Sequence, residues 1–85
     1  MNEFFAYAYE QAKRIKGLAT IVTLSPKGDL RIQVNWKDAC KRGGDMIIAY
    51  AEEPDTKEAF REALERLKKW INEHEEEINE KIRYM

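Results

Sequence analysis

The chain has 85 residues with 15 basic and 16 acidic side chains, so its formal net charge is −1. With 44% hydrophobic and 36% charged residues it forms one small globular domain over residues 1–85, which excludes a disordered acidic chain and a generic polyanion binder. No apolar run is long enough to span a bilayer, and no basic-then-apolar leader follows Met1, so the sequence predicts a cytoplasmic protein without membrane attachment.

A first helix is predicted over residues 2–16. Asn2 is a suitable N-cap residue, and Gly17 stands where the chain leaves the helix and a positive φ is often required. Four apolar residues recur at helical spacing and are expected to face the core: Phe5, Ala8, Ala12 and Ile15. Tyr7 points roughly away from this stripe and is therefore predicted to be the most exposed aromatic residue of the helix.

Two strands, residues 18–24 and 30–37, are predicted to form a hairpin. The sequence Ser25-Pro26-Lys27-Gly28 matches a three-residue loop that ends in a glycine bulge, and such a loop pairs Ser25 with Asp29. Counting from that pair puts one apolar set on a single buried face: Leu18, Val22, Leu24, Leu30, Ile32, Val34 and Trp36. The opposite face carries Ala19, Ile21 and Thr23 beside Arg31, Gln33 and Asn35.

Residues 46–51 are predicted to form a third strand that is apolar on both faces. Either both faces are covered, or one of them supplies a contact surface. A long helix then begins at Asp55, which stands with Glu58 in the spacing of a capping box. Its apolar stripe continues to the end of the chain: Phe60, Leu64, Leu67, Ile71, His74, Ile78, Ile82 and Met85.

The elements predict an α+β fold of two layers in the order αβββα, with both helices packed on the apolar face of an antiparallel meander. A helix of roughly 28 residues is about 42 Å long, whereas a strand of about seven residues spans roughly 23 Å. The distal segment, residues 72–85, is therefore expected either to project beyond the core or to fold back over the first helix.

No constellation of residues indicates an enzyme, a metal site or a cofactor. His74 is the only histidine, so the chain has no pair of metal-spaced histidines and no Ser/His/Asp set. Cys40 is the only cysteine and cannot form an internal disulfide. Its basic neighbours would lower the pKa of a reactive thiol, but an isolated cysteine in a polar loop is more often incidental.

The distal helix is the main candidate for a binding surface. The chain has eight basic and five acidic residues up to Tyr50, a net charge of +3, and seven basic against eleven acidic residues from Ala51, a net charge of −4. An acidic amphipathic helix whose apolar side has no strand to cover it is typical of a protein interface. The predicted interface residues are Ile71, His74, Glu75, Ile78 and Ile82.

The order of helix, three-stranded meander and helix resembles double-stranded-RNA-binding domains. That family carries a lysine-rich segment at the start of its second helix, where it contacts phosphates. Here the corresponding residues 52–58 hold four carboxylates, which argues against binding of double-stranded RNA. The same layout also resembles small phage-encoded anti-CRISPR inhibitors, a likeness that implies an inhibitor with an acidic surface.

The sequence therefore predicts a non-enzymatic protein-binding module, an inhibitor or regulator that binds another protein or a second copy of itself through the distal helix. One alternative is a nucleic-acid-binding regulator that uses Arg31, Lys37, Lys41 and Arg42 on the sheet face and the basic loop. Another alternative is a designed domain without a natural function, because the cap, the turn and the strand alternation agree so well.

Overall fold

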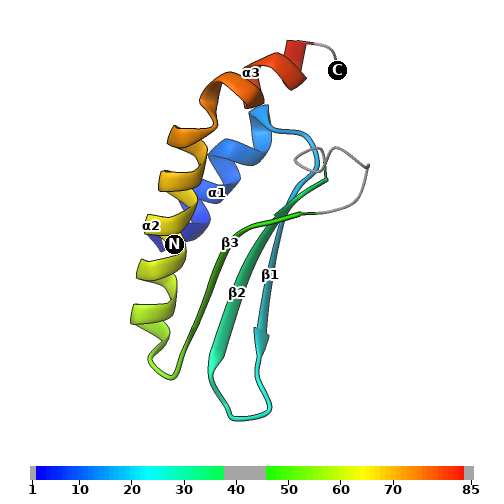
Figure 1. Ribbon diagram of the computed structural model, residues 1–85. Helices are drawn as coiled ribbons and strands as arrows, with labels where there is room; N and C mark the ends of the chain where they lie inside the picture. The colour runs from blue at the N-terminus through cyan, green and yellow to red at the C-terminus, as the bar shows by residue number, and fades with distance from the viewer. Residues whose placement is uncertain (1, 38–45, 84–85) are drawn as a thin grey trace.

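The computed structural model describes residues 2–37 and 46–83. These residues form, in chain order, α1 (Glu3–Arg14), β1 (Leu18–Leu24), β2 (Leu30–Trp36), β3 (Met46–Glu53), α2 (Thr56–Glu73) and α3 (Glu75–Arg83). The sheet is antiparallel with the strand order β1-β2-β3, and the helices lie on one side of it (Figure 1). The predicted α+β class and antiparallel meander are confirmed.

The β1–β2 hairpin has the predicted register over its whole length, from Leu18 opposite Trp36 to Leu24 opposite Leu30. The turn explains why: the Ser25 amide donates to the Asp29 carbonyl at 2.8 Å, and the Gly28 amide donates to the Ser25 carbonyl at 2.9 Å. Gly28 has a φ of 88°, the left-handed conformation that this loop requires. The loop chemistry therefore sets the pairing of the two strands.

The core lies between α2 and the two strands β2 and β3. Ile32, Val34 and Trp36 of β2 are fully buried. Alanines stand on both sides of the contact with β3, which lets the helix approach the strand closely: Ala49, Ala51, Ala59 and Ala63. The Trp36 indole nitrogen donates to the Lys16 carbonyl at 3.0 Å, so its polar edge is satisfied inside the core.

A bulge in the β2–β3 pairing decides which face of the third strand is buried. The register shifts between Val34 and Asn35, so that Ile48 has no residue opposite it on β2. Both Ile48 and Ala49 are buried as a result, while Ile47 and Tyr50 are exposed on the other side. The two-faced apolar pattern of residues 46–51 thus reflects a bulge rather than a strand covered on both sides.

The first helix buries a different face from the predicted one. Asn2 is its N-cap, as expected, and accepts a hydrogen bond from the Phe5 amide at 2.8 Å. However, Phe4, not Phe5, joins Ala8 and Ile15 in the core. The reason is that α1 packs against α2, where the rings of Phe4 and Phe60 lie 5.9 Å apart, instead of lying flat on the sheet.

This rotation of α1 moves further residues from their predicted positions. Ala12, expected in the core, is exposed. Tyr7, expected to be exposed, is half-buried against the core, and this burial raises the pKa of its phenol. Tyr9 is instead the most exposed aromatic residue of the helix.

The predicted single long helix is divided at His74. The His74 residue leaves the helical conformation, with φ −117° and ψ 20°, and its amide donates to the carbonyls of Trp70 and Ile71. After this break α3 leaves the axis of α2 and crosses the end of the molecule (Figure 1). Ile78 is fully buried, so the distal segment packs on the core rather than projecting from it.

Strand β1 is the largest departure from the predicted core. Leu18 is half-buried, but Val22 is 38% exposed and Leu24 is 71% exposed, although the pattern placed all three under the helices. A helix is about 10 Å wide and strands lie about 4.8 Å apart. Helix α2 therefore covers β2 and β3, and α1, held against α2, reaches β1 only near its start.

Candidate protein interface

The residues predicted to form an interface on the distal helix make contacts within the chain. Ile71 is 2% exposed and Ile78 is fully buried, while Ile82 is half-buried against the core. His74 stacks on Trp70 with the ring centroids 4.1 Å apart, and its Nδ1 lies 2.8 Å from the Trp70 carbonyl oxygen. The apolar side of the distal helix is therefore covered within the chain.

Glu75 has an internal partner as well. Its carboxylate accepts two hydrogen bonds from Arg14, at 2.8 and 3.1 Å, and this two-pronged ion pair joins α1 to α3 across 61 positions of sequence. A bidentate arginine–carboxylate pair constrains the relative orientation of the two side chains and also pairs their charges. Arg14 and Glu75 thus link the end of α1 to the start of α3.

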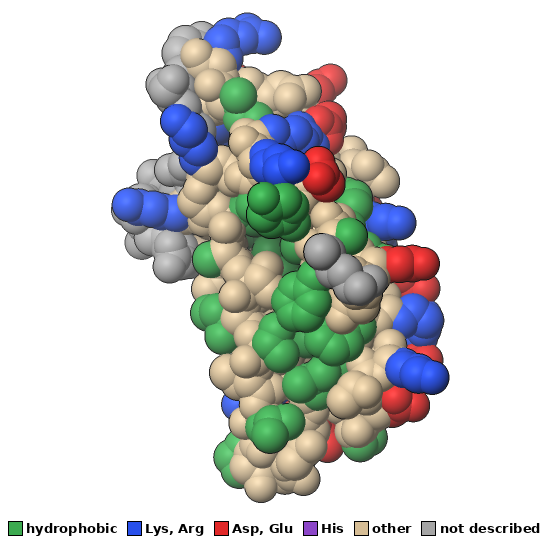
Figure 2. Space-filling model, turned by 180° about the vertical axis from the view of Figure 1, so that it is seen from behind, with side chains coloured by type: hydrophobic (Ala, Val, Ile, Leu, Met, Phe, Trp, Pro, Cys, Tyr) green, Lys and Arg blue, Asp and Glu red, His purple; other side chains and the backbone are tan. Residues whose placement is uncertain are grey.

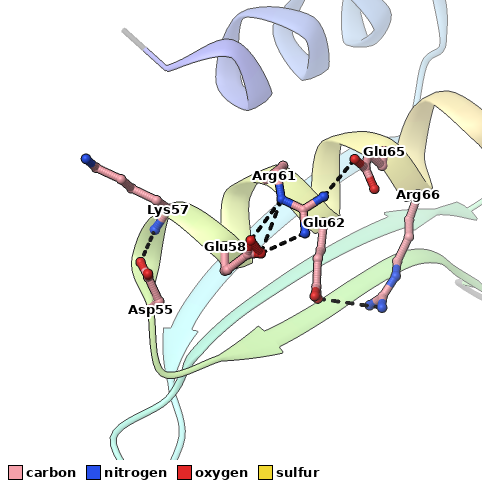
Figure 3. A network of polar contacts seen from close by, with 7 residues as sticks. All are labelled: Asp55, Lys57, Glu58, Arg61, Glu62, Glu65 and Arg66. Atoms are coloured by element: carbon pink, nitrogen blue, oxygen red, sulfur yellow. Dashed lines mark hydrogen bonds and ion pairs between the residues drawn. The ribbon is translucent and has the colours of Figure 1, made fainter.

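The solvent face of α2 carries ion pairs within the helix (Figure 3). Asp55 caps the helix and accepts from the Lys57 amide at 2.9 Å, while Glu58 pairs with Arg61 and not with the cap. Arg61 also contacts Glu65 at 2.8 Å. Exposed pairs at this spacing contribute a few tenths of a kcal/mol each, so part of the acidic charge of α2 is balanced within the helix.

The uncovered face of the sheet is cross-linked by polar side chains. Arg31 donates to Glu52 at 2.8 Å, and the Tyr50 hydroxyl donates to the same carboxylate at 2.6 Å. These two bonds hold the pKa of Glu52 below its usual value and raise the pKa of both Tyr50 and Arg31. Part of the positive charge that the nucleic-acid hypothesis needs on this face is thereby neutralised.

The other residues of the nucleic-acid hypothesis are only partly placed by the structure. Lys37 is exposed directly after the end of β2, while Arg31 lies near the opposite end of that strand. Lys41 and Arg42 lie outside the described residues, as does Cys40. The two basic residues of this set that the structure describes, Arg31 and Lys37, therefore lie at opposite ends of β2.

Strand β1 presents an open edge that the sequence pattern did not predict. We call the outward side of Leu18–Leu24 the β1 edge; no strand of the described residues pairs with it. Since Ser25 bonds to Asp29, antiparallel alternation turns the N–H and C=O groups of Thr20, Val22 and Leu24 away from β2. The strand has seven residues and none is charged, so it lacks the usual devices that block strand addition.

The opposite edge of the sheet shows those devices. Strand β3 contains the bulge near its start and two acidic residues, Glu52 and Glu53, at its end. Arg66 of α2 also donates to the Tyr50 carbonyl, which occupies a backbone acceptor of β3. The two edges of one small sheet thus differ: β3 is guarded, and β1 is open.

An apolar groove runs beside the β1 edge, on the same side as the helices. It holds about 390 Å³ and is open to solvent. We call it the α1–β1 groove; it is lined by Phe5, Ala8, Tyr9, Ala12, Leu18 and Thr20. Seen from behind, hydrophobic side chains gather in the middle of this side of the molecule, and the charged side chains lie mostly above them and along one flank (Figure 2).

One signal for this surface was present in the sequence. Both faces of residues 18–24 are uncharged, which is unusual for a strand with one solvated face. The paired strand carries Arg31, Gln33 and Asn35 on its solvent face, so the sequence itself shows the contrast. What the sequence did not reveal was the rotation of α1, which leaves this strand uncovered.

Other kinds of site are not formed by the described residues. Within 2–37 and 46–83, no group of three or more His, Cys, Asp or Glu side chains is placed to hold a metal ion. None of the helices that the structure describes is both long and apolar enough to cross a membrane. Comparison of the chain with protein-family models, with curated proteins and with solved structures gives no match.

Proposed function

We propose that this chain is a non-enzymatic protein-binding module that captures an extended polypeptide segment along the β1 edge. The partner segment adds a strand beside β1 through main-chain hydrogen bonds, and one of its apolar side chains enters the α1–β1 groove. The sequence also predicted a protein-binding module, but through the distal helix. Because the apolar side of that helix is covered within the chain, we place the binding surface on the β1 edge instead.

The observation that carries the proposal is the open, uncharged β1 edge beside an apolar groove. Outward-facing amides and carbonyls at Thr20, Val22 and Leu24 supply the main-chain contacts. The neighbouring groove supplies a pocket for side chains that alternate along an added strand. A main-chain donor row next to an apolar pocket is the arrangement by which strand-adding domains bind peptides.

The chemistry of this surface favours a polypeptide over a nucleic acid. The strand carries no basic side chain to meet phosphates, and five of the six groove residues are apolar or aromatic. Nucleic-acid binding depends on Lys and Arg contacts with phosphates and weakens steeply with salt. Strand addition depends on backbone bonds and apolar burial, so we expect binding that survives high salt.

A substitution at Val22 tests strand addition. Its N–H points away from β2, and proline is tolerated at such edge positions because no internal hydrogen bond is lost. Val22→Pro should therefore fold, as judged by circular dichroism, while removing one donor from the β1 edge. Val22→Ala is the matched control, because it shortens the side chain and keeps the donor.

The probe is a display library of random extended peptides, selected on wild-type protein that is immobilised sparsely enough to keep copies apart. Enriched peptides should bind wild type and Val22→Ala, and should bind Val22→Pro at least about tenfold more weakly, a loss of roughly 1.4 kcal/mol. Enrichment of no peptide, or equal binding to wild type and the proline variant, would overturn the proposal.

A further inference from the structure

We infer that the segment captured by the β1 edge is β1 of a second copy of this chain, so that two copies join their sheets about a two-fold axis. This inference rests on the proposed function and names its partner. The product would be a continuous antiparallel sheet in which the two β1 strands are central and the guarded β3 strands form both outer edges.

The backbone of β1 is self-complementary in one full-length register. A two-fold axis through Ile21 places Thr20 opposite Val22 of the second copy and Leu18 opposite Leu24 of the second copy. Thr20 and Val22 turn both backbone groups outward, so each donates to and accepts from the other across the axis. The Leu18 amide donates to the Ile15 carbonyl at 3.3 Å, so at the end pair the Leu18 carbonyl accepts from the Leu24 amide. Ile21 then lies opposite Ile21 of the second copy as a non-hydrogen-bonded pair. The pairing spans all seven residues of the strand.

The side chains fit the same register. Leu24 is the most exposed of the large apolar side chains at one end of the strand, and Leu18, at the other end, lines the α1–β1 groove. The two-fold axis brings each Leu24 opposite the other copy's Leu18 and hence to the other copy's groove. Because Leu24 and the groove lie at opposite ends of the strand, each Leu24 reaches the groove of the other copy only when the two copies pair antiparallel.

The charge and the area of the surface also agree with self-pairing. The pairing sets no charged residue opposite another, because Leu18–Leu24 contains none. Five large apolar side chains are exposed here: Phe5, Tyr9, Ile21, Val22 and Leu24. At about 200 Å² for a fully exposed large side chain, their exposed fractions amount to roughly 500 Å². The strand backbone raises this toward the ~800 Å² per partner of a standard interface.

Disulfide trapping tests the register. In a Cys40→Ser background, Ile21→Cys should link two copies rapidly under mild oxidation, because the Cα atoms of a non-hydrogen-bonded pair lie about 4.5 Å apart. Thr23→Cys is the matched control on the same face of the same strand. In the proposed register Thr23 faces Ala19, so two Thr23 residues are roughly 13 Å apart, and their linkage should be at least about tenfold slower.

A second measurement covers the side chains. Leu24→Asp should weaken self-association by at least about tenfold in sedimentation at two concentrations, because a carboxylate would have to enter the apolar groove. Met46→Asp is the control, since Met46 is an exposed apolar residue on the guarded edge strand. Equal linkage of the two cysteine variants, or a wild type that stays monomeric at both concentrations, would overturn the second copy as partner. Displayed peptides would then still report on strand addition itself, through their loss of binding to Val22→Pro.

Discussion

The distal helix and strand β1 differ from their patterns in opposite directions: the helix, predicted to lack cover, is buried, and the strand, predicted to be covered, is exposed. The apolar stripe of the distal helix had no strand to cover it, yet Ile78 is fully buried. Strand β1 had an apolar face matched residue by residue to β2, yet Leu24 is 71% exposed. An apolar pattern thus shows that a surface gains from being covered, but it does not show which part of the protein, or which partner, covers it.

This difference has a physical cause: the number of strands that two helices can cover. Helix α2 is wide enough for two strands, and the covering of the third strand depends on α1. The contacts of Phe4 with Phe60, and of Arg14 with Glu75, hold α1 against the other helices instead. With α1 held there, β1 stays open along most of its length.

The largest expected effect is a difference in the free energy of unfolding between substitutions in the two regions. Ile78→Ala should lower the free energy of unfolding by about 2–5 kcal/mol, because it opens a cavity at a fully buried site. Leu24→Ala should change it by no more than about 0.5 kcal/mol in the monomer. Urea denaturation at high dilution measures both. Similar losses for the two variants would mean that the regions do not differ as described.

A smaller effect is expected at the turn that holds β1 to the sheet. Gly28→Ala should cost about 1–2 kcal/mol, because the φ of 88° strains any residue with a Cβ atom. No heavy atom beyond residues 27–29 lies within 4 Å of the position of that Cβ, so the loss comes from the backbone conformation. Gly28→Asn, which tolerates this conformation better, should recover part of the stability. Equal denaturation midpoints for wild type and Gly28→Ala would show that the turn does not set the register.

The smallest effect concerns the uncovered sheet face and pH. The folded-state pKa of Glu52 is below its usual value of 4.5, so its contacts with Tyr50 and Arg31 stabilise the fold above that value. This contribution disappears as the pH falls through the lowered pKa. Glu52→Gln should therefore be less stable than wild type near neutral pH, and the difference should vanish in acid. A difference that is independent of pH would contradict the role given to this carboxylate.

The sequence was most informative where local chemistry decides structure. The turn at Ser25 and Gly28, the caps at Asn2 and Asp55, and the register of the hairpin all depend on residues within a few positions of each other. The candidate interface depends on the rotation of α1, which is set by the contact of Phe4 with a helix more than 50 positions away. Such contacts leave no periodic signal, and so the sequence pattern did not indicate that β1 would be left uncovered.

The most direct test of the account is amide hydrogen exchange along β1, measured residue by residue at a low and a high protein concentration. At low concentration Ile21 and Thr23 should be protected by β2, while Thr20 and Val22 should exchange freely. At high concentration Thr20 and Val22 should gain protection as the β1 edge is occupied. Protection of all four amides at low concentration, or free exchange of Thr20 and Val22 at both concentrations, would contradict the account.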